Sequence, residues 1–223
     1  MRELIINLHG IGEPPAAVDA NEKPYWWSVE AFNLLLDQIS GIPANTDPRV
    51  SLTFDDGNAS DALLALPRLH RSGLFASFFV CAGRVGKRHY LDRSMIRDLL
   101  DAGMGVGSHG MNHVDWRTIS STDLEVEISG ARKMLEAVVE QPITMAAIPF
   151  GSYDRRVLRR LKQERFDFIY TSDGGIADAT SVIKPRETVD KGMQDCDVIL
   201  EFMKSTPLRS AARALSRLYK RIR

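Results

Sequence analysis

Strand-like and helix-like hydrophobic patterns alternate along this chain of 223 residues. Short apolar runs that are typical of buried strands are followed by segments in which apolar residues recur at helical spacing. The strand-like runs cover residues 4–8, 50–54, 75–80, 103–107, 144–148, 167–171 and 181–183. Repeated strand-then-helix units predict an α/β fold with a parallel sheet. About seven strands favour a closed or distorted barrel of the (β/α)7 type, similar to a TIM barrel.

The chain is organised as one domain with a short extension. The most extended helical pattern is amphipathic and runs from Thr122 to Val139, with acidic residues in its first turn. Hydrophobic residues make up 44% of the chain, which is enough for a real core. No linker, repeat or low-complexity segment interrupts the alternating pattern. We therefore predict a barrel domain over residues 1–203 and an extension over residues 204–223.

Two pairs of metal-binding or acid–base side chains follow two of the predicted strands. Asp55 and Asp56 come directly after the run 50–54, and His109 and His113 come after the run 103–107. Two histidines and one carboxylate can bind a divalent metal such as Zn²⁺ and leave positions open for water and substrate. The second carboxylate could then act as a general base. Taken alone, the histidines could also be a buried pair that hydrogen-bonds to the backbone.

The same residues resemble the motifs of a known family. Thr-Phe-Asp-Asp-Gly at 53–57 and Ser-His-Gly-Met-Asn-His at 108–113 resemble the first two motifs of the NodB-homology polysaccharide deacetylases, carbohydrate esterase family 4. Pro-Phe-Gly at 149–151 is similar to the core of their third motif. The resemblance spans roughly residues 4–190. It implies a NodB-like barrel and a metal-dependent hydrolase that removes N-acetyl groups from an amino sugar in a poly- or oligosaccharide.

Position by position, the resemblance implies roles for four side chains. Asp55 matches the family's catalytic base. Asp56, His109 and His113 match its metal ligands, and the metal implied is one divalent ion, with Zn²⁺ as the default. A carboxylate that binds a metal has its lone pairs committed, whereas a free carboxylate can accept a proton from the attacking water.

The chain departs from the family pattern at two positions. Ala147 stands where the third motif usually has an arginine that orients the catalytic aspartate. The last motif usually supplies a histidine as general acid, but the region 195–200 has none and no histidine follows His113. These departures leave two alternatives open. One is a deformylase or other non-peptide amide hydrolase on the same barrel, and the other is a catalytically impaired saccharide-binding protein.

His9 is our candidate for the missing acid. It follows the first strand-like run, and a closed barrel would place the first strand beside the last. The segment 8–14, together with Tyr25 and Trp26, resembles deacetylases associated with exopolysaccharide synthesis. Asp173, near the family's fourth motif, could pair with His9 and raise its pKa. Alternatively, His9 is a hydrogen-bonding loop residue and Asp173 only caps a glycine-rich turn.

Four further residues could support the site. Arg186 could replace the missing arginine by contacting Asp55, or it could be a surface residue. Phe150 and Tyr153 could line a substrate wall, and Trp26 could stack on a sugar ring.

Charge suggests the partners and the location. The chain has no net charge at neutral pH, which argues against a nucleic-acid partner and leaves a saccharide as the expected one. The extension 204–223 is basic, with no acidic residue, and has apolar residues at helical spacing. Such a helix could lie on an anionic membrane surface or dock on the acidic barrel. The N-terminus reads as a strand rather than a signal peptide, so we expect a cytoplasmic protein that could be membrane-peripheral.

Overall fold

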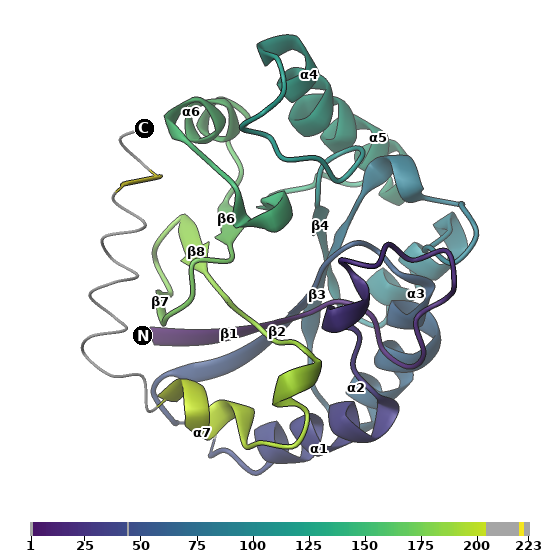
Figure 1. The fold of residues 1–223 in the computed structure, drawn as a ribbon, viewed down its shortest axis with the longest axis vertical. Helices are drawn as coiled ribbons and strands as arrows, with labels where there is room; N and C mark the ends of the chain where they lie inside the picture. Colours follow the sequence, from purple (N-terminus) through teal and green to yellow (C-terminus); the bar gives the residue numbers. More distant parts are fainter. Residues whose placement is uncertain (1, 44, 204–218, 221–223) are drawn as a thin grey trace.

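The computed structural model describes residues 2–43, 45–203 and 219–220, and these form an α/β barrel (Figure 1). The predicted barrel is confirmed. One nine-stranded sheet has the order β7-β1-β2-β3-β4-β5-β6-β8, and β9 also pairs with β1. The strands are β1 (Arg2–Leu8), β2 (Arg49–Phe54), β3 (Ala76–Val80), β4 (Gly105–Ser108), β5 (Met145–Ala147), β6 (Phe168–Thr171), β7 (Ala177–Asp178), β8 (Ile183–Pro185) and β9 (Glu187–Thr188).

The last two strands close the barrel because they pair with different neighbours. β8 pairs with β6, and β9, which follows after the single residue Arg186, pairs with β1. These pairings and those from β1 to β6 are parallel, whereas β7 adds an antiparallel edge to β1. The first strand therefore lies beside the last, as we predicted. The two-residue strands β7 and β9 were not predicted, because such short segments carry no periodicity.

Helices cover the outside of the sheet (Figure 1). The long predicted helix is confirmed: its first turn begins at Ser121, and it continues to Val139 through a wider turn at 126–130. Ser120 caps its first turn by accepting a hydrogen bond from the backbone N–H of Asp123. The helices are α1 (Val29–Ser40), the wide turn Asp61–Ala65 with α2 (Leu66–Arg71), α3 (Arg93–Asp101), α4 (Ser121–Glu125), α5 (Ala131–Val139), α6 (Arg155–Gln163) and α7 (Val198–Met203). The region 195–200, which we compared with the family's last motif, thus leads into helix α7 and is not a strand.

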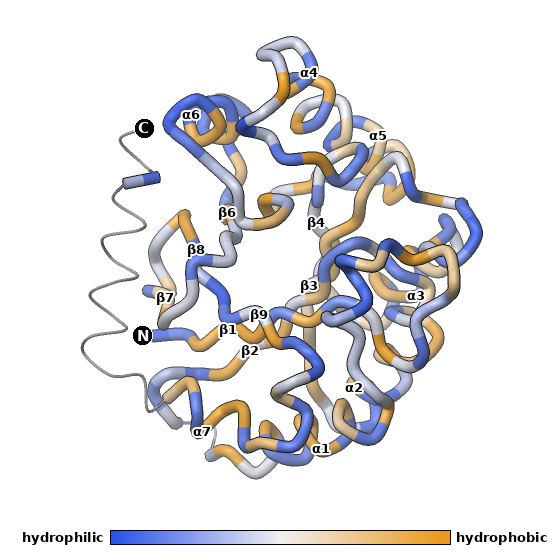
Figure 2. The backbone as a smooth tube through the Cα atoms, in the orientation of Figure 1, coloured by the Kyte–Doolittle hydropathy of each residue, from blue (hydrophilic) through white to orange (hydrophobic). Residues whose placement is uncertain are grey.

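The two faces of the strands have different chemistry, because successive side chains of a strand point to opposite faces. One face packs aromatic and aliphatic groups against the helices; the rings of Phe54 and Phe78 stack with centroids 4.8 Å apart, and Phe32 of α1 meets Phe54 edge-on. The other face holds polar groups such as Asn7 and Thr53, both fully buried. Figure 2 shows the apolar segments concentrated in the strands and on the helix faces that cover them.

The C-terminal extension that we predicted over residues 204–223 lies outside the described residues, except for Tyr219 and Lys220. The division into a domain and an extension therefore stays a prediction. Among the described helices, none is long and apolar enough to cross a membrane.

Candidate active site

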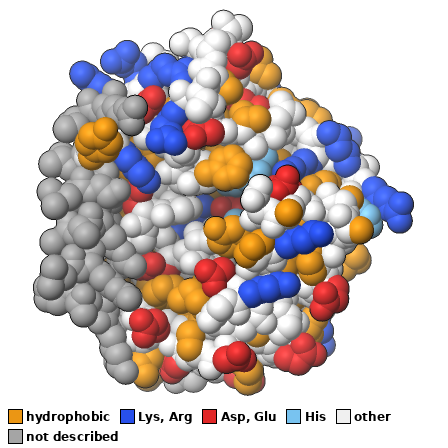
Figure 3. All heavy atoms as spheres, viewed as in Figure 1, with side chains coloured by type: hydrophobic (Ala, Val, Ile, Leu, Met, Phe, Trp, Pro, Cys, Tyr) orange, Lys and Arg blue, Asp and Glu red, His pale blue; other side chains and the backbone are white. Residues whose placement is uncertain are grey.

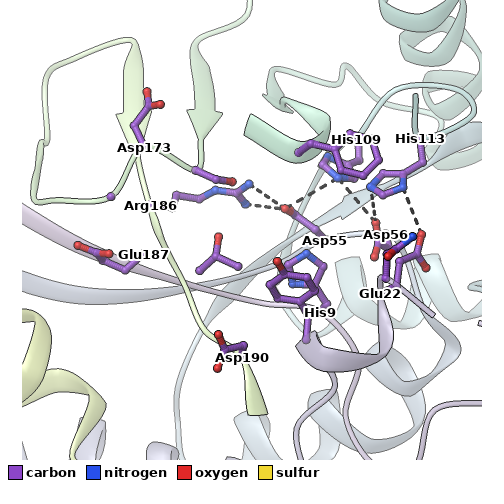
Figure 4. Close-up of a pocket in the computed structure, with 16 residues that line it drawn as sticks. His9, Glu22, Asp55, Asp56, His109, His113, Asp173, Arg186, Glu187 and Asp190 are labelled. Atoms are coloured by element: carbon purple, nitrogen blue, oxygen red, sulfur yellow. Dashed lines mark hydrogen bonds and ion pairs between the residues drawn. The ribbon is translucent and has the colours of Figure 1, made fainter. Parts of the chain in front are cut away.

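The carboxyl ends of the parallel strands meet around one pocket of about 580 Å³ (Figure 4). Asp55 and Asp56 follow β2, His109 follows β4, and His9 follows β1, so the sheet register carries these side chains to the same rim. In the space-filling view, the centre of this face is hollowed, with histidine and acidic atoms visible inside (Figure 3). The residues that line the pocket are His9, Asn21, Glu22, Tyr25, Asp55, Asp56, His109, His113, Phe150, Ser172, Asp173, Gly174, Arg186, Glu187, Thr188 and Asp190.

Asp56, His109 and His113 form a group that could hold a metal ion. One ligand atom from each residue lies within 4.8 Å of the others. Asp56 Oδ1 is 3.2 Å from His113 Nε2 and 3.7 Å from His109 Nε2. This carboxylate oxygen is buried and has no hydrogen-bond partner among the described residues. A buried oxygen of this kind needs a partner, and a divalent cation between one carboxylate and two imidazoles would supply it.

The backbone around these ligands adopts left-handed conformations. Asp56 has φ of 78° and His113 has φ of 56°, and Gly57 between the strand and the following helical turn has φ of 70°. Non-glycine residues at positive φ are uncommon and cluster at functional sites, where the surrounding structure holds them in place. Here the unusual conformations turn Asp56 and His113 toward the same point.

Each imidazole is held through its Nδ1 atom, so its Nε2 atom is available. His109 Nδ1 lies 3.0 Å from the carbonyl oxygen of Ala147, which can only accept a hydrogen bond. Burial lowers the pKa of His109 to about 4, which keeps the ring neutral at neutral pH. His113 Nδ1 lies 3.2 Å from Glu22 Oε1. Burial alone would lower the pKa of His113, but its hydrogen bond to Glu22 raises it. In both rings an acceptor at Nδ1 favours a proton on that atom, which leaves Nε2 as the nitrogen that can bind a metal.

Asp55 is bound most closely by the guanidinium of Arg186, and its Oδ2 also lies 3.9 Å from His109 Nε2. Arg186 donates from NH1 to Asp55 Oδ1 and from NH2 to Oδ2, both at 2.8 Å, and its side chain is completely buried. Asn7 Nδ2 also donates to Asp55 Oδ2 at 3.0 Å, and Arg186 NH1 reaches Asn7 Oδ1 at 2.8 Å. Burial alone would raise the pKa of Asp55, but the guanidinium of Arg186 holds it below its usual range, so Asp55 is ionised.

Arg186 therefore supplies the cation beside Asp55 that Ala147, at the arginine position of the family's third motif, cannot supply. Ala147 ends β5 and is buried, whereas Arg186 enters the barrel from the junction of β8 and β9. Its guanidinium lies over the rings of Phe79 and Tyr170, with centroid distances of 5.4 Å and 5.8 Å. These rings pack the flat guanidinium and fix its direction toward Asp55.

His9 lies at the rim of the pocket, but it does not form the predicted pair with Asp173. Its ring stacks on Tyr25 at a centroid distance of 5.0 Å, and its Nδ1 is buried without a hydrogen-bond partner among the described residues. Asp173 instead accepts hydrogen bonds from Tyr153 and Thr171 and forms an ion pair with Lys220 at 2.6 Å. The pairing prediction is wrong because the segment from β8 to β9 lies between β6 and β1 and separates the two side chains (Figure 4).

Two of the aromatic residues that we expected to contact substrate, Trp26 as a stacking residue and Tyr153 as part of the substrate wall, are packing residues instead. Trp26 is 3% exposed and does not line the pocket, because its ring packs where a Cβ atom on Gly10 would lie. Tyr153 is 1% exposed, and its hydroxyl donates to Asp173 at 2.6 Å. Phe150 does line the pocket; the residue is 62% exposed, and its ring centroid is 4.4 Å from that of His113.

Sequence reasoning missed four residues that support the site. Glu22 and Arg84 contact the histidine–aspartate group, and Asn7 and Thr53 contact Arg186. Burial would raise the pKa of Glu22, but hydrogen bonds from His113 and Arg84 lower it to about 2. A polar residue within the apolar run 4–8 was a usable signal for Asn7. Glu22 lies in a loop and Arg84 in a short helical turn, and no local pattern marks either residue.

Comparisons with known proteins agree with the fold and the motifs. The family model for polysaccharide deacetylase matches residues 43–169. The chain therefore belongs to the polysaccharide deacetylase family. A peptidoglycan-N-acetylglucosamine deacetylase of Bacillus cereus is 28% identical over 131 residues, which cover 57% of this chain and 58% of that relative. The chain spans 25% to 58% of the length of the curated relatives that it matches here.

Two solved structures show the same fold over nearly the whole chain. The Streptococcus pyogenes deacetylase PplD, in complex with acetate, has a TM-score of 0.77 at 20% identity and covers 92% of this chain and 99% of that chain. IcaB from Ammonifex degensii has a TM-score of 0.75 at 17% identity and covers 91% of this chain and 97% of that chain.

Proposed function

We propose that this protein is a metal-dependent hydrolase that removes N-acetyl groups from an amino sugar in a poly- or oligosaccharide. The observation that carries the proposal is the convergence of Asp55, Asp56, His109 and His113 at one rim of the barrel. Membership of the polysaccharide deacetylase family supports the reaction class. The substrate class follows from the names of relatives, such as the peptidoglycan-N-acetylglucosamine deacetylase.

Asp56, His109 and His113 would hold the metal, for which Zn²⁺ is the default because two imidazoles and a carboxylate suit it. When bound there, the ion would polarise the acetamide carbonyl and stabilise the negative charge that develops on its oxygen. Side chains of this protein would carry out the proton transfers of the reaction.

Asp55 is the proposed general base. Its Oδ2 accepts hydrogen bonds from Arg186 and Asn7, whereas its Oδ1 accepts from Arg186 and retains a second lone pair. We propose that this carboxylate takes a proton from the attacking water as the water adds to the acetyl carbon. Arg186 fixes the orientation of the carboxylate, in the role that the family's missing arginine would have at position 147.

His9 is the proposed general acid. The C–N bond can break only if the departing amine receives a proton, and no histidine follows His113 in the sequence. His9 lines the pocket together with Asp55, and its unpartnered Nδ1 has no hydrogen bond that commits it elsewhere among the described residues. The products are then acetate and a sugar with a free amine.

Phe150 is the proposed contact for the sugar ring. Its exposed face and its position against His113 suit stacking beside the scissile amide.

Two alternatives are less well supported. The retained pair of Asp55 and Arg186 argues against an impaired saccharide-binding protein, and nothing in the pocket favours an N-formyl over an N-acetyl group.

An assay with matched substrates tests this proposal. Purified protein loaded with Zn²⁺ is incubated with N-acetylglucosamine oligomers, the corresponding N-formyl oligomers and a chromogenic acetyl ester, and the released acid is measured. We expect release of acetate from the N-acetyl oligomers. Faster release of formate would favour the deformylase alternative, and no hydrolysis of any substrate, the ester included, would contradict the catalytic proposal.

A further inference from the structure

Glu22 reaches the candidate metal group from a part of the chain outside the family motifs. It lies in the loop between β1 and α1, just before the helical turn Lys23–Tyr25, and is 9% exposed. Its Oε1 atom is 3.2 Å from His113 Nδ1. Figure 4 shows Glu22 on the side of the His113 ring that faces away from His109.

The two histidines have the same arrangement of acceptors around the ring. His109 has a backbone carbonyl at Nδ1, and His113 has the carboxylate of Glu22 at Nδ1. On the opposite side of each ring, Nε2 lies near Asp56 Oδ1. The carbonyl at His109 belongs to Ala147, the last residue of a strand, and it is part of the barrel itself. The acceptor at His113 is a side chain, so it can be removed by substitution.

Glu22 is held in place by a second interaction. Arg84, in the helical turn after β3, donates from NH2 to Glu22 Oε1 at 2.8 Å. The guanidinium of Arg84 also lies over the ring of Tyr90, with its carbon 4.9 Å from the ring centroid. Arg84 NH1 is 3.7 Å from Asp56 Oδ1. Arg84 therefore places a positive charge beside the group, and Glu22 lies between that charge and His113.

We propose that Glu22 is a positioning residue for metal binding, which acts by accepting a hydrogen bond from His113 Nδ1. The hydrogen bond keeps the proton on Nδ1, leaves the lone pair on Nε2 and fixes the plane of the ring. A carboxylate partner also makes the imidazole a more basic ligand. This inference rests on the proposed metal site at Asp56, His109 and His113.

Substitution of Glu22 tests the inference through metal affinity rather than through activity. We expect Glu22→Met to weaken Zn²⁺ binding about 10- to 100-fold, the usual cost of losing such a partner, measured by competition with a chromophoric chelator. Glu22→Gln keeps an acceptor without the charge and should lose less. Glu30→Gln, an exposed carboxylate on α1, is the matched control and should bind Zn²⁺ like the wild type. An unchanged Kd in Glu22→Met would overturn the inference.

A double-mutant comparison separates positioning from simple charge balance. Removal of Glu22 also leaves Arg84 uncompensated beside Asp56, and this alone could weaken the binding of a cation. In an Arg84→Met background this second effect is absent. If Glu22 acts on His113, Glu22→Met still weakens Zn²⁺ binding there. If the loss vanishes in that background, Glu22 does not position His113 and the inference is wrong.

Two further measurements keep the result interpretable. Melting of each variant in EDTA reveals a folding defect, in which case Glu22→Gln replaces Glu22→Met in the comparison. The visible spectrum of the Co²⁺-loaded protein reports ligand geometry and should differ between Glu22→Met and Glu30→Gln. A wild type that binds Zn²⁺ tightly without hydrolysing the substrates would contradict the proposed function but leave this inference standing.

Discussion

At the scale of single residues, the two adjacent aspartates have different partners and so should have separable effects. Both aspartates lie near His109, but only Asp55 is bound by Arg186 and only Asp56 lies close to His113. We predict that Asp55→Asn lowers the maximal rate by about 10² to 10⁴ fold, the range for a positioned base. Its metal content should stay near that of the wild type, as measured by elemental analysis after dialysis. His109→Ala should lose both activity and metal.

The Asp55→Asn variant must be shown to fold before its activity is compared with that of the wild type. The substitution leaves Arg186 as a buried cation without its carboxylate, which costs up to about 3–5 kcal/mol of stability. Activity must therefore be compared at a temperature at which circular dichroism shows a folded variant. A folded Asp55→Asn protein without metal would mean that Asp55, and not only Asp56, is a ligand.

His9 gives a prediction that depends on the leaving group. We expect His9→Ala to lower the rate of N-deacetylation by about 10² to 10⁴ fold with little change in metal affinity. Hydrolysis of an activated acetyl ester should fall much less, because a good leaving group needs little protonation. Kinetics with both substrates measure the difference. Equal losses on the amide and the ester would show that His9 is not the acid.

At the scale of elements, the loop between β1 and α1 depends on a close contact between a glycine and a tryptophan. A Cβ atom on Gly10 would overlap the ring of Trp26, which is buried. We predict that Gly10→Ala destabilises the protein by about 1–3 kcal/mol, since the ring must move in a packed region. Urea unfolding measures this, with Gly41→Ala as control because a Cβ atom there has its nearest contacts at 3.5 Å.

The same loop carries His9 and Glu22, so its packing should also affect the site. A Gly10→Ala protein with unchanged stability would contradict the packing argument.

Sequence periodicity predicted the strands and the helix that ends at Val139, because the buried face of a regular strand or helix leaves a repeating pattern of apolar residues in the sequence. It could not predict this loop, whose conformation depends on contacts between irregular segments.

At the scale of the whole molecule, metal binding should stabilise the closed barrel. The three candidate ligands lie in the segments that follow β2 and β4, and the unfolded chain does not hold them together. A ligand that binds only the folded state stabilises it by about 2.7 kcal/mol at 100 times its Kd. We predict that Zn²⁺ raises the melting temperature by roughly 5–10 °C relative to EDTA. His113→Ala should abolish this shift, and a wild type that melts identically in Zn²⁺ and EDTA would contradict the metal site.

The sequence alone determined the barrel and the group of Asp55, Asp56, His109 and His113. Both follow from local information, because hydrophobic periodicity marks each strand and parallel strands end at one rim. The tertiary structure alone decided which side chains support that group. Arg186 meets Asp55 across 131 residues of chain, and Glu22 meets His113 from a distant loop. The predicted pair of His9 and Asp173 failed for the same physical reason: contacts between strand ends depend on which segment closes the barrel between them, and no local pattern encodes that choice.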